Sequence, residues 1–214
     1  MRVVATIILP VGPWLLVGCR PPTDRERFLA AIAEVRAGKT TALDVRDHPQ
    51  LADDDLIALR GLTGLETLNL DNARVSDAGL AHLADITSLR SLSLTNTRIT
   101  DDGLKELAGL HNLEFFRADR TRITDAGLPP LKAMKNLREV SFWKNYITDK
   151  GRSVLQELPR LERLSLDATA VSDAGPVSLA GLPHLKFVAV RETRVTQAGA
   201  DRVRASRTDI EVLP

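Results

Sequence analysis

Leucine recurs every 24 residues through most of this chain, and that period constrains the fold more than any other feature. Aligned on it, six repeats follow the pattern L-x-x-L-x-L-x-x-T-x-I-T-D-x-G-L-x-x-L-x-x-L-x-x, most clearly over residues 89–112. We number them repeats 1 to 6 from their first residues, which are Leu65, Leu89, Leu113, Leu137, Leu161 and Leu185. An earlier, degenerate unit over about 40–64 is one residue longer. The chain is therefore one structural unit used many times.

Each repeat combines two hydrophobic spacings. In repeat 2, Leu92 and Leu94 alternate with polar residues, which is the period of a strand. After Gly103, Leu104 and Leu107 are spaced for one face of a short helix. A Ser/Thr-Asp pair stands before most of these helical stretches, and either side chain can accept a hydrogen bond from the free amides of a helix start. Each repeat is therefore predicted to be a strand followed by a short helix.

A single 24-residue unit cannot bury enough apolar surface to fold alone, so neighbouring units must stack. The pattern resembles the leucine-rich-repeat family, whose units of 20–29 residues carry a strand and a helix or tighter turn. The resemblance covers residues 40–214. It implies an α/β fold: a right-handed leucine-rich-repeat solenoid with a parallel β-sheet on the concave face and short helices on the convex face.

The ends of such a solenoid need covers. Hydrophobic residues at helical spacing predict an N-terminal capping helix over 24–39, and residues 209–213 predict a terminal strand. Arg152 and Pro176 replace the leucine that opens the helix in other repeats. Irregular convex segments are therefore expected in repeats 4 and 5.

The first 18 residues have the features of a secretory signal peptide. Arg2 is followed by an apolar run over 3–17 that is interrupted by prolines and is shorter than the roughly 20 residues of a membrane-spanning helix. The run ends in Leu-Val-Gly before Cys19, which resembles the lipobox of bacterial lipoproteins. That resemblance implies lipidation of Cys19, a short tether over 19–23, and a location on the extracytoplasmic side of a membrane in the cell envelope. An ordinary signal peptide with an incidental cysteine stays open as the alternative.

Composition excludes several classes of function. Cys19 is the single cysteine, so the mature chain has no intramolecular disulfide and no cysteine-based metal site or nucleophile. Without residues 1–18, the basic residues fall from 29 to 28 and equal the 28 acidic ones, which argues against nucleic acid as a partner. The four histidines lack metal-ligand spacing. No cofactor, metal or catalytic site is expected, and the protein is expected to be a monomer.

A row of aspartates is the most tempting site for chemistry. Carboxylates in a row can hold calcium or act in acid–base catalysis. This row stands at every predicted helix start, so capping is the favoured interpretation, and the glycine two residues later indicates a close-packed bend. The aspartates are Asp77, Asp101, Asp125, Asp149 and Asp173.

The outward positions of the strands form the candidate recognition surface. Strand alternation places the third, fifth and seventh residues of each repeat outward, with the eighth beside them. Trp143 is the sole tryptophan after the leader, and aromatic and arginine side chains are typical of binding hot spots. The ring could instead only shield neighbouring strands. The candidate protein-binding residues are Phe115, Arg117, Asp119, Arg120, Glu139, Ser141, Trp143, Lys144, Arg163 and Asp167.

Two charged columns complete the pattern. The second residues of successive repeats alternate in sign, so opposite charges should lie side by side. The tenth residues include Arg74, Arg98 and Arg122 in adjacent repeats, and Arg194. These arginines could attract an anionic partner, but neutralisation by aspartates such as Asp71 and Asp119 is the favoured interpretation.

The sequence therefore favours a non-enzymatic, lipid-anchored binding or scaffold protein that recognises a protein or other macromolecule on its concave face. Two alternatives remain. The repeats also resemble the leucine-rich regions of cytosolic F-box adaptors, which present substrates to ubiquitin ligases, although no F-box segment stands in this sequence. The solenoid could also be a purely structural spacer.

Overall fold

The computed structural model describes residues 21–46 and 48–214. The predicted signal peptide over 1–18 and the predicted lipidation site Cys19 lie outside the described residues. Within the described part, no helix is long and apolar enough to cross a membrane.

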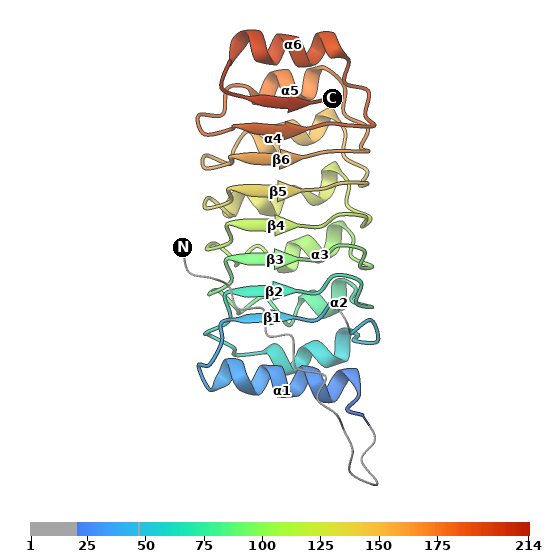
Figure 1. Cartoon of the computed structure of the whole chain (residues 1–214), viewed down its shortest axis with the longest axis vertical. Helices are drawn as coiled ribbons and strands as arrows, with labels where there is room; N and C mark the ends of the chain where they lie inside the picture. The colour runs from blue at the N-terminus through green and yellow to red at the C-terminus, as the bar shows by residue number, and fades with distance from the viewer. Residues whose placement is uncertain (1–20, 47) are drawn as a thin grey trace.

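Eight short strands form one parallel sheet, in which each strand pairs with the next one along the chain (Figure 1). The register advances by one repeat per strand, so Leu68 pairs with Leu92 and Leu92 with Phe116. The central residue of each strand points into the core. The strands are β1 (Ala42–Asp44), β2 (Thr67–Asn69), β3 (Ser91–Ser93), β4 (Phe115–Arg117), β5 (Glu139–Ser141), β6 (Arg163–Ser165), β7 (Phe187–Ala189) and β8 (Glu211–Leu213).

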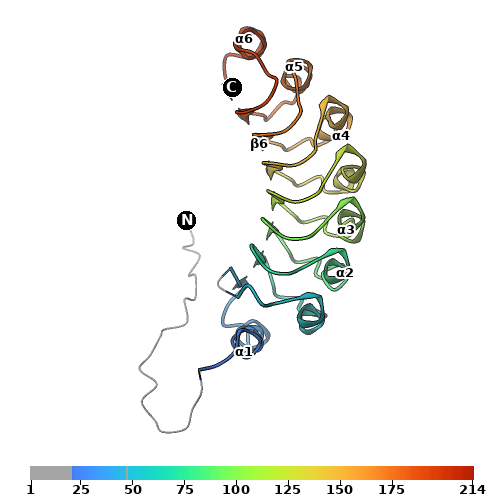
Figure 2. The same cartoon turned by 90° about the vertical axis from the view of Figure 1, so that its right-hand side faces the viewer.

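Helical segments line the opposite, convex side, and the solenoid curves with its sheet inward (Figure 2). The α-helices are α1 (Asp24–Arg36), α2 (Asp77–Leu80), α3 (Asp101–Glu106), α4 (Arg152–Leu155), α5 (Ala174–Leu179) and α6 (Gln197–Ser206). The 3₁₀ segments are η1 (Asp53–Leu59), η2 (Asp125–Gly127), η3 (Pro129–Ala133) and η4 (Asp149–Gly151). The predicted leucine-rich-repeat solenoid is therefore confirmed.

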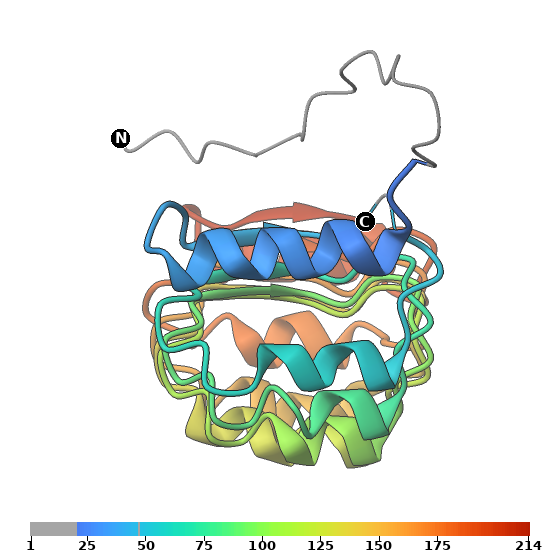
Figure 3. The ribbon, with the colours of Figure 1, turned by 90° about the horizontal axis from the view of Figure 1, so that it is seen from below.

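The N-terminal end is covered by α1, which lies across the open end of the solenoid (Figure 3). Its start carries a capping box: Thr23 accepts from the amide of Glu26, and the Glu26 side chain accepts from the amide of Thr23. Phe28 and Ile32 are buried where α1 packs against β1 and η1 of the degenerate unit. The helix ends three residues before the predicted limit at 39.

The convex side differs from the sequence expectation. Repeat 5 forms a regular helix, α5, because Pro176 falls in its first turn, where a missing amide costs no hydrogen bond. Irregularity appears instead in repeat 3, where Pro129 and Pro130 follow one another and only 3₁₀ segments form. Repeat 4 combines η4 with the single turn of α4, as expected.

The aspartate that recurs at the helix starts does not cap its own helix as predicted; it joins its repeat to the next one. Asp77 accepts from the amide of Thr100 at 2.7 Å and from its hydroxyl at 2.6 Å. The threonine hydroxyl is the cap, since it also accepts from the amide of Asp102. The same bridge recurs from Asp53 to Ser76 and onward to the bridge from Asp173 to Thr196. We call this row the aspartate ladder.

The ladder also explains the glycine of the T-D-x-G motif. A Cβ on Gly79 would lie 2.5 Å from Oδ1 of Asp53, and one on Gly175 would lie 2.9 Å from Oδ1 of Asp149. Gly103, Gly127, Gly151 and Gly199 meet the preceding aspartate in the same way. The predicted close-packed bend is confirmed, and its cause is the carboxylate of the previous repeat.

Candidate functional site

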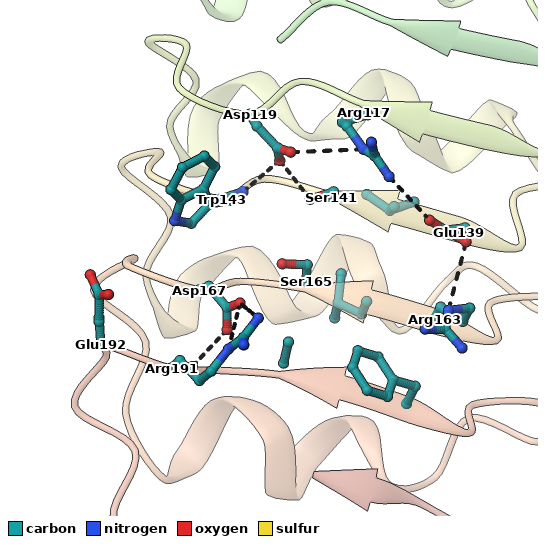
Figure 4. A pocket seen from close by; sticks show the side chains of 14 residues that line it. Arg117, Asp119, Glu139, Ser141, Trp143, Arg163, Ser165, Asp167, Arg191 and Glu192 are labelled. Atoms are coloured by element: carbon teal, nitrogen blue, oxygen red, sulfur yellow. Dashed lines mark hydrogen bonds and ion pairs between the residues drawn. The ribbon is translucent and has the colours of Figure 1, made fainter. Parts of the chain in front are cut away.

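The C-terminal half of the concave face carries a shallow cavity of about 480 Å³ over β4 to β7 (Figure 4). Strand alternation supplies its walls, because residues at the third, fifth and seventh positions of each repeat point away from the core. It is lined by Arg117, Asp119, Glu139, Val140, Ser141, Trp143, Arg163, Leu164, Ser165, Asp167, Phe187, Ala189, Arg191 and Glu192.

A chain of charged side chains crosses the face from β4 to β6. Arg117 lies 3.8 Å from Asp119 and 3.6 Å from Glu139, and Glu139 lies 3.7 Å from Arg163 (Figure 4). These distances are longer than those of tight, charge-assisted hydrogen bonds. A bound partner can therefore exchange with these pairs without first breaking strong bonds.

The far side of the cavity is built on β7. The guanidinium of Arg163 lies 4.5 Å from the ring centroid of Phe187, within cation–π range. Arg191 is held more tightly, since its Nη2 donates to Oδ2 of Asp167 at 2.7 Å and its Nε donates at 3.1 Å. These two hydrogen bonds to one carboxylate oxygen raise the pKa of Arg191 above its ordinary value.

Trp143 follows the end of β5 and is half-buried, with two cations near its ring. The guanidinium of Arg120 lies 5.7 Å from the ring centroid, and the ammonium of Lys144 lies 5.3 Å from it. Both residues have positive φ angles, near 53° and 56°, which turns the chain after each strand. The indole is therefore held at the rim of the cavity by residues from its own repeat and the one before.

Asp119 is buried, in contrast to its predicted exposure, and only 8% of its surface is accessible. Its Oδ1 accepts from the Ser141 hydroxyl at 2.5 Å and from the Trp143 amide at 2.8 Å. Burial raises the pKa of the Asp119 carboxyl, and the hydrogen bonds from Ser141 and Trp143 oppose that shift. Ser141 and Asp167 are buried too, so these three residues support the face more than they present it.

Asp71 and Asp167 hold the following repeat in the same way as Asp119. Oδ1 of Asp71 accepts from the Thr95 amide, and Oδ1 of Asp167 accepts from the Arg191 amide. The three aspartates recur every 48 residues, in repeats 1, 3 and 5. This double period is a sequence signal that a single-repeat alignment overlooks.

The structure brings most of the predicted binding residues together. Seven of them line the cavity: Arg117, Asp119, Glu139, Ser141, Trp143, Arg163 and Asp167. Arg120 and Lys144 lie against Trp143, while Phe115 is 43% exposed on β4 outside the cavity lining. Four further lining residues were not predicted from the sequence: Phe187, Ala189, Arg191 and Glu192. They occupy the same outward positions in repeat 6, so extending the pattern by one repeat predicts them.

The two charged columns behave differently. In the second-residue column the predicted pairing is confirmed, since Arg90 lies 2.5 Å from Glu114 and Arg138 lies 2.8 Å from Glu162. In the tenth-residue column the predicted neutralisation by Asp71 and Asp119 is wrong. Asp71 and Asp119 are engaged by other groups. Across 21–46 and 48–214, the arginines at the tenth position therefore form no ion pair; they are Arg74, Arg98, Arg122 and Arg194.

The side chains that line the cavity suit binding better than catalysis. Among the described residues, no three histidine, cysteine or acidic side chains gather as a metal site. The cavity offers aromatic rings, guanidinium groups and carboxylates on an open surface, which are groups that recognise another macromolecule.

Comparisons with known proteins agree with the repeat. A family profile described as "Leucine Rich repeat" matches residues 86–108. The structure of internalin C2 from Listeria monocytogenes is similar over 91% of this chain and 97% of its own length, with a TM-score of 0.63 and 22% identity. A second internalin from that organism, inlF, is similar over 85% of this chain, with a TM-score of 0.50 and 22% identity, and 63% of its length is covered.

No curated protein matches the chain by sequence. Identity of 22% to the two internalins establishes likeness of fold and nothing about their partners. The 24-residue period, the family match over residues 86–108 and the single parallel sheet together show that the chain folds as a leucine-rich-repeat solenoid.

Proposed function

We propose that this chain is a non-enzymatic binding protein that recognises a protein partner on the C-terminal half of its concave face. The observation that carries the proposal is the cavity over β4 to β7, where Trp143, Phe187 and three arginines surround an open surface. Tryptophan and arginine dominate the energetics of protein interfaces. Side chains of this size on four adjacent strands are not needed to hold the solenoid together, since the leucines and the aspartate ladder do so.

The face is also preorganised for binding. Asp119 fixes the backbone at Trp143, and Asp167 fixes both the backbone and the guanidinium of Arg191. Rigid anchors lose little conformational entropy when a partner binds, which leaves more of the contact energy for affinity.

The same proposal places the protein in a bacterial cell envelope, lipid-anchored through Cys19 on the extracytoplasmic side of a membrane. Support comes from the signal-like residues 1–18 and from the Leu-Val-Gly-Cys ending. Labelling with an alkyne fatty acid in bacteria should mark the wild-type chain and leave Cys19→Ala unlabelled. Equal labelling of both chains, or of neither, contradicts lipidation at this residue.

A photo-crosslinking amino acid tests the binding face in living cells. At Ser165, inside the cavity, it should capture a discrete protein partner, whereas at Ser91 on β3 it should capture none. Combining the Ser165 probe with Phe187→Ala should remove the adduct. A purely structural spacer would give no discrete adduct from either position, and a partner bound elsewhere would be captured from Ser91 alone.

A further inference from the structure

We propose that the flank beside the concave face, built from the tenth residues of the repeats, binds a linear acidic polysaccharide. We call this surface the arginine flank and define it by Arg74, Arg98, Arg122 and Tyr146. It lies outside the cavity over β4 to β7, and its argument does not depend on the protein-binding proposal.

The backbone holds the arginine flank in register. The amide of Arg98 donates to the carbonyl of Val75 at 2.8 Å, and the amide of Arg122 donates to Ile99 at 3.1 Å. Tyr146 continues the row, since its backbone amide donates to the carbonyl of Ile123 at 2.9 Å. Isolated parallel bridges join Arg122 to Thr100 and Tyr146 to Thr124 of the preceding repeat, so tenth residues recur once per coil, at about the 4.8 Å spacing of neighbouring strands. Three guanidinium groups and one phenol ring therefore start from successive coils of the solenoid.

The guanidinium groups of this row are available to a ligand. All four side chains are exposed, and in the described part of the chain no carboxylate forms an ion pair with the three arginines. The aspartate ladder stands three residues further along each repeat and keeps its negative charge. Its oxygens are held by the next repeat, as in Asp77, which accepts from both the amide and the hydroxyl of Thr100, and in the described residues none forms an ion pair with these arginines.

The neighbouring eighth-residue column strengthens the positive field. It adds Arg120 and Lys144, against one carboxylate at Glu192 in repeat 6. By contrast, the second-residue column in the same repeats pairs its cations with Glu114 and Glu162. Among the described residues, the flank therefore gathers adjacent cations that form no ion pair.

The row fits an acidic polysaccharide better than other polyanions. Tyr146 is 66% exposed at the end of the arginine row, and an open phenol ring can stack on the face of a sugar. Acidic side chains on one face of an extended peptide recur about every 6.6 Å, out of step with the row. Nucleic acid rewards a strongly basic protein, whereas this chain has a net charge of +1.

Binding should be measured with the full-length chain in detergent against immobilised polygalacturonate, heparin, neutral dextran and duplex DNA. The first two distinguish carboxylate from sulfate groups as the anion. The test variant is Arg74→Gln, Arg98→Gln and Arg122→Gln together. The matched control removes the same charge from the paired column through Arg90→Gln, Arg138→Gln and Lys186→Gln, and thermal melts check that both variants fold.

We expect at least one acidic polysaccharide to bind and neutral dextran not to bind. The test variant should lose affinity about tenfold or more at low salt, and its slope of log affinity against log salt should fall by about 2 to 3. The control should stay within about threefold of wild type because its cations are already paired. Tyr146→Ala should weaken polysaccharide binding without changing the salt slope.

Three results would overturn the proposal. If neither acidic polysaccharide binds the wild-type chain, the proposed ligand is excluded. Equal losses in the test and control variants would show an unspecific response to charge. Tighter binding to DNA that ignores Tyr146→Ala would assign the flank to nucleic acid.

Discussion

The two halves of the concave face share one backbone and differ most in the outward side chain that begins each strand. Over β2 and β3 the outward residues are small and polar, as in Thr67, Asn69, Ser91 and Ser93. Over β4 to β7 the first residue of each strand is large or charged, namely Phe115, Glu139, Arg163 and Phe187, and Arg117 adds a second charge on β4. The pairing register does not change between the halves. Inward and bridging residues therefore specify the fold, while outward residues are free to specify a partner.

Glycine of the T-D-x-G motif tests whether both halves rest on one frame, and it should give the largest effect on stability. Gly79→Ala and Gly175→Ala both push a methyl group into a ladder carboxylate. Each should lower the free energy of unfolding by about 2 to 4 kcal/mol, because the carboxylate must give up hydrogen bonds or the repeat must shift. Chemical denaturation measures this.

The matched control is Gly181→Ala, whose new Cβ would have nothing within 4 Å. It should change stability by less than about 0.5 kcal/mol. A large loss in one half and none in the other would break the claim of a shared frame.

The aspartate ladder should give a slightly smaller and equally uniform effect. Asp77→Ala leaves the amide and hydroxyl of Thr100 without their acceptor, and Asp149→Ala does the same to Ser172. Each loss should be about 2 kcal/mol in unfolding free energy. Exposed Asp54→Ala serves as the control. Losses that match this control would show that the bridges contribute nothing.

Asp119 sharpens the comparison, because its buried carboxyl belongs to the C-terminal half. Its pKa is raised, so the folded state binds a proton more readily than the unfolded chain does. Wild type should therefore gain stability relative to Asp119→Asn as pH falls through that raised pKa toward the unfolded value of about 3.9.

Trp143 emission in a Trp14→Phe background reports the same titration, since the Trp143 amide donates to Asp119. The midpoint should lie above the ordinary aspartate value, and Asp119→Asn should abolish the transition. A midpoint at or below that value would contradict the assigned burial.

The paired column should give the smallest effect. The side chains of Arg90 and Arg138 are 58% and 51% exposed. Arg90→Gln and Arg138→Gln should each change the unfolding free energy by less than about 0.5 kcal/mol, and added salt should reduce even that difference. A larger loss from either variant, measured by denaturation at low salt, would show that these pairs help to stack the repeats.

Most of the architecture could be predicted because it depends on local spacing. Leucine alternation and the 24-residue period determine the sheet, its order and the inward residues. The pairing of Arg90 with Glu114 also followed from the repeat. The fold therefore required no information from beyond neighbouring repeats.

Some contacts could not be predicted, because an alignment of the repeats does not give the distances between side chains of neighbouring coils. The carboxylate of Asp77 reaches forward to Thr100 instead of capping its own helix, since the distance between coils decides which amide is closer. Asp119 and Asp167 point outward by alternation, yet the following strand covers them. Phe187 and Arg191 occupy the third and seventh positions of repeat 6, so the repeat pattern does place them on the same outward face.

The central claim is that recognition belongs to one half of a uniform solenoid. Its most direct test is the affinity of the full-length chain for the protein captured at Ser165. Phe115→Ala, Trp143→Ala and Phe187→Ala together should weaken that affinity about 100-fold or more, whereas Thr67→Ala, Ser91→Ala and Ser93→Ala together should change it less than about threefold. Equal losses from the two triple variants, or a greater loss from the second, would contradict it.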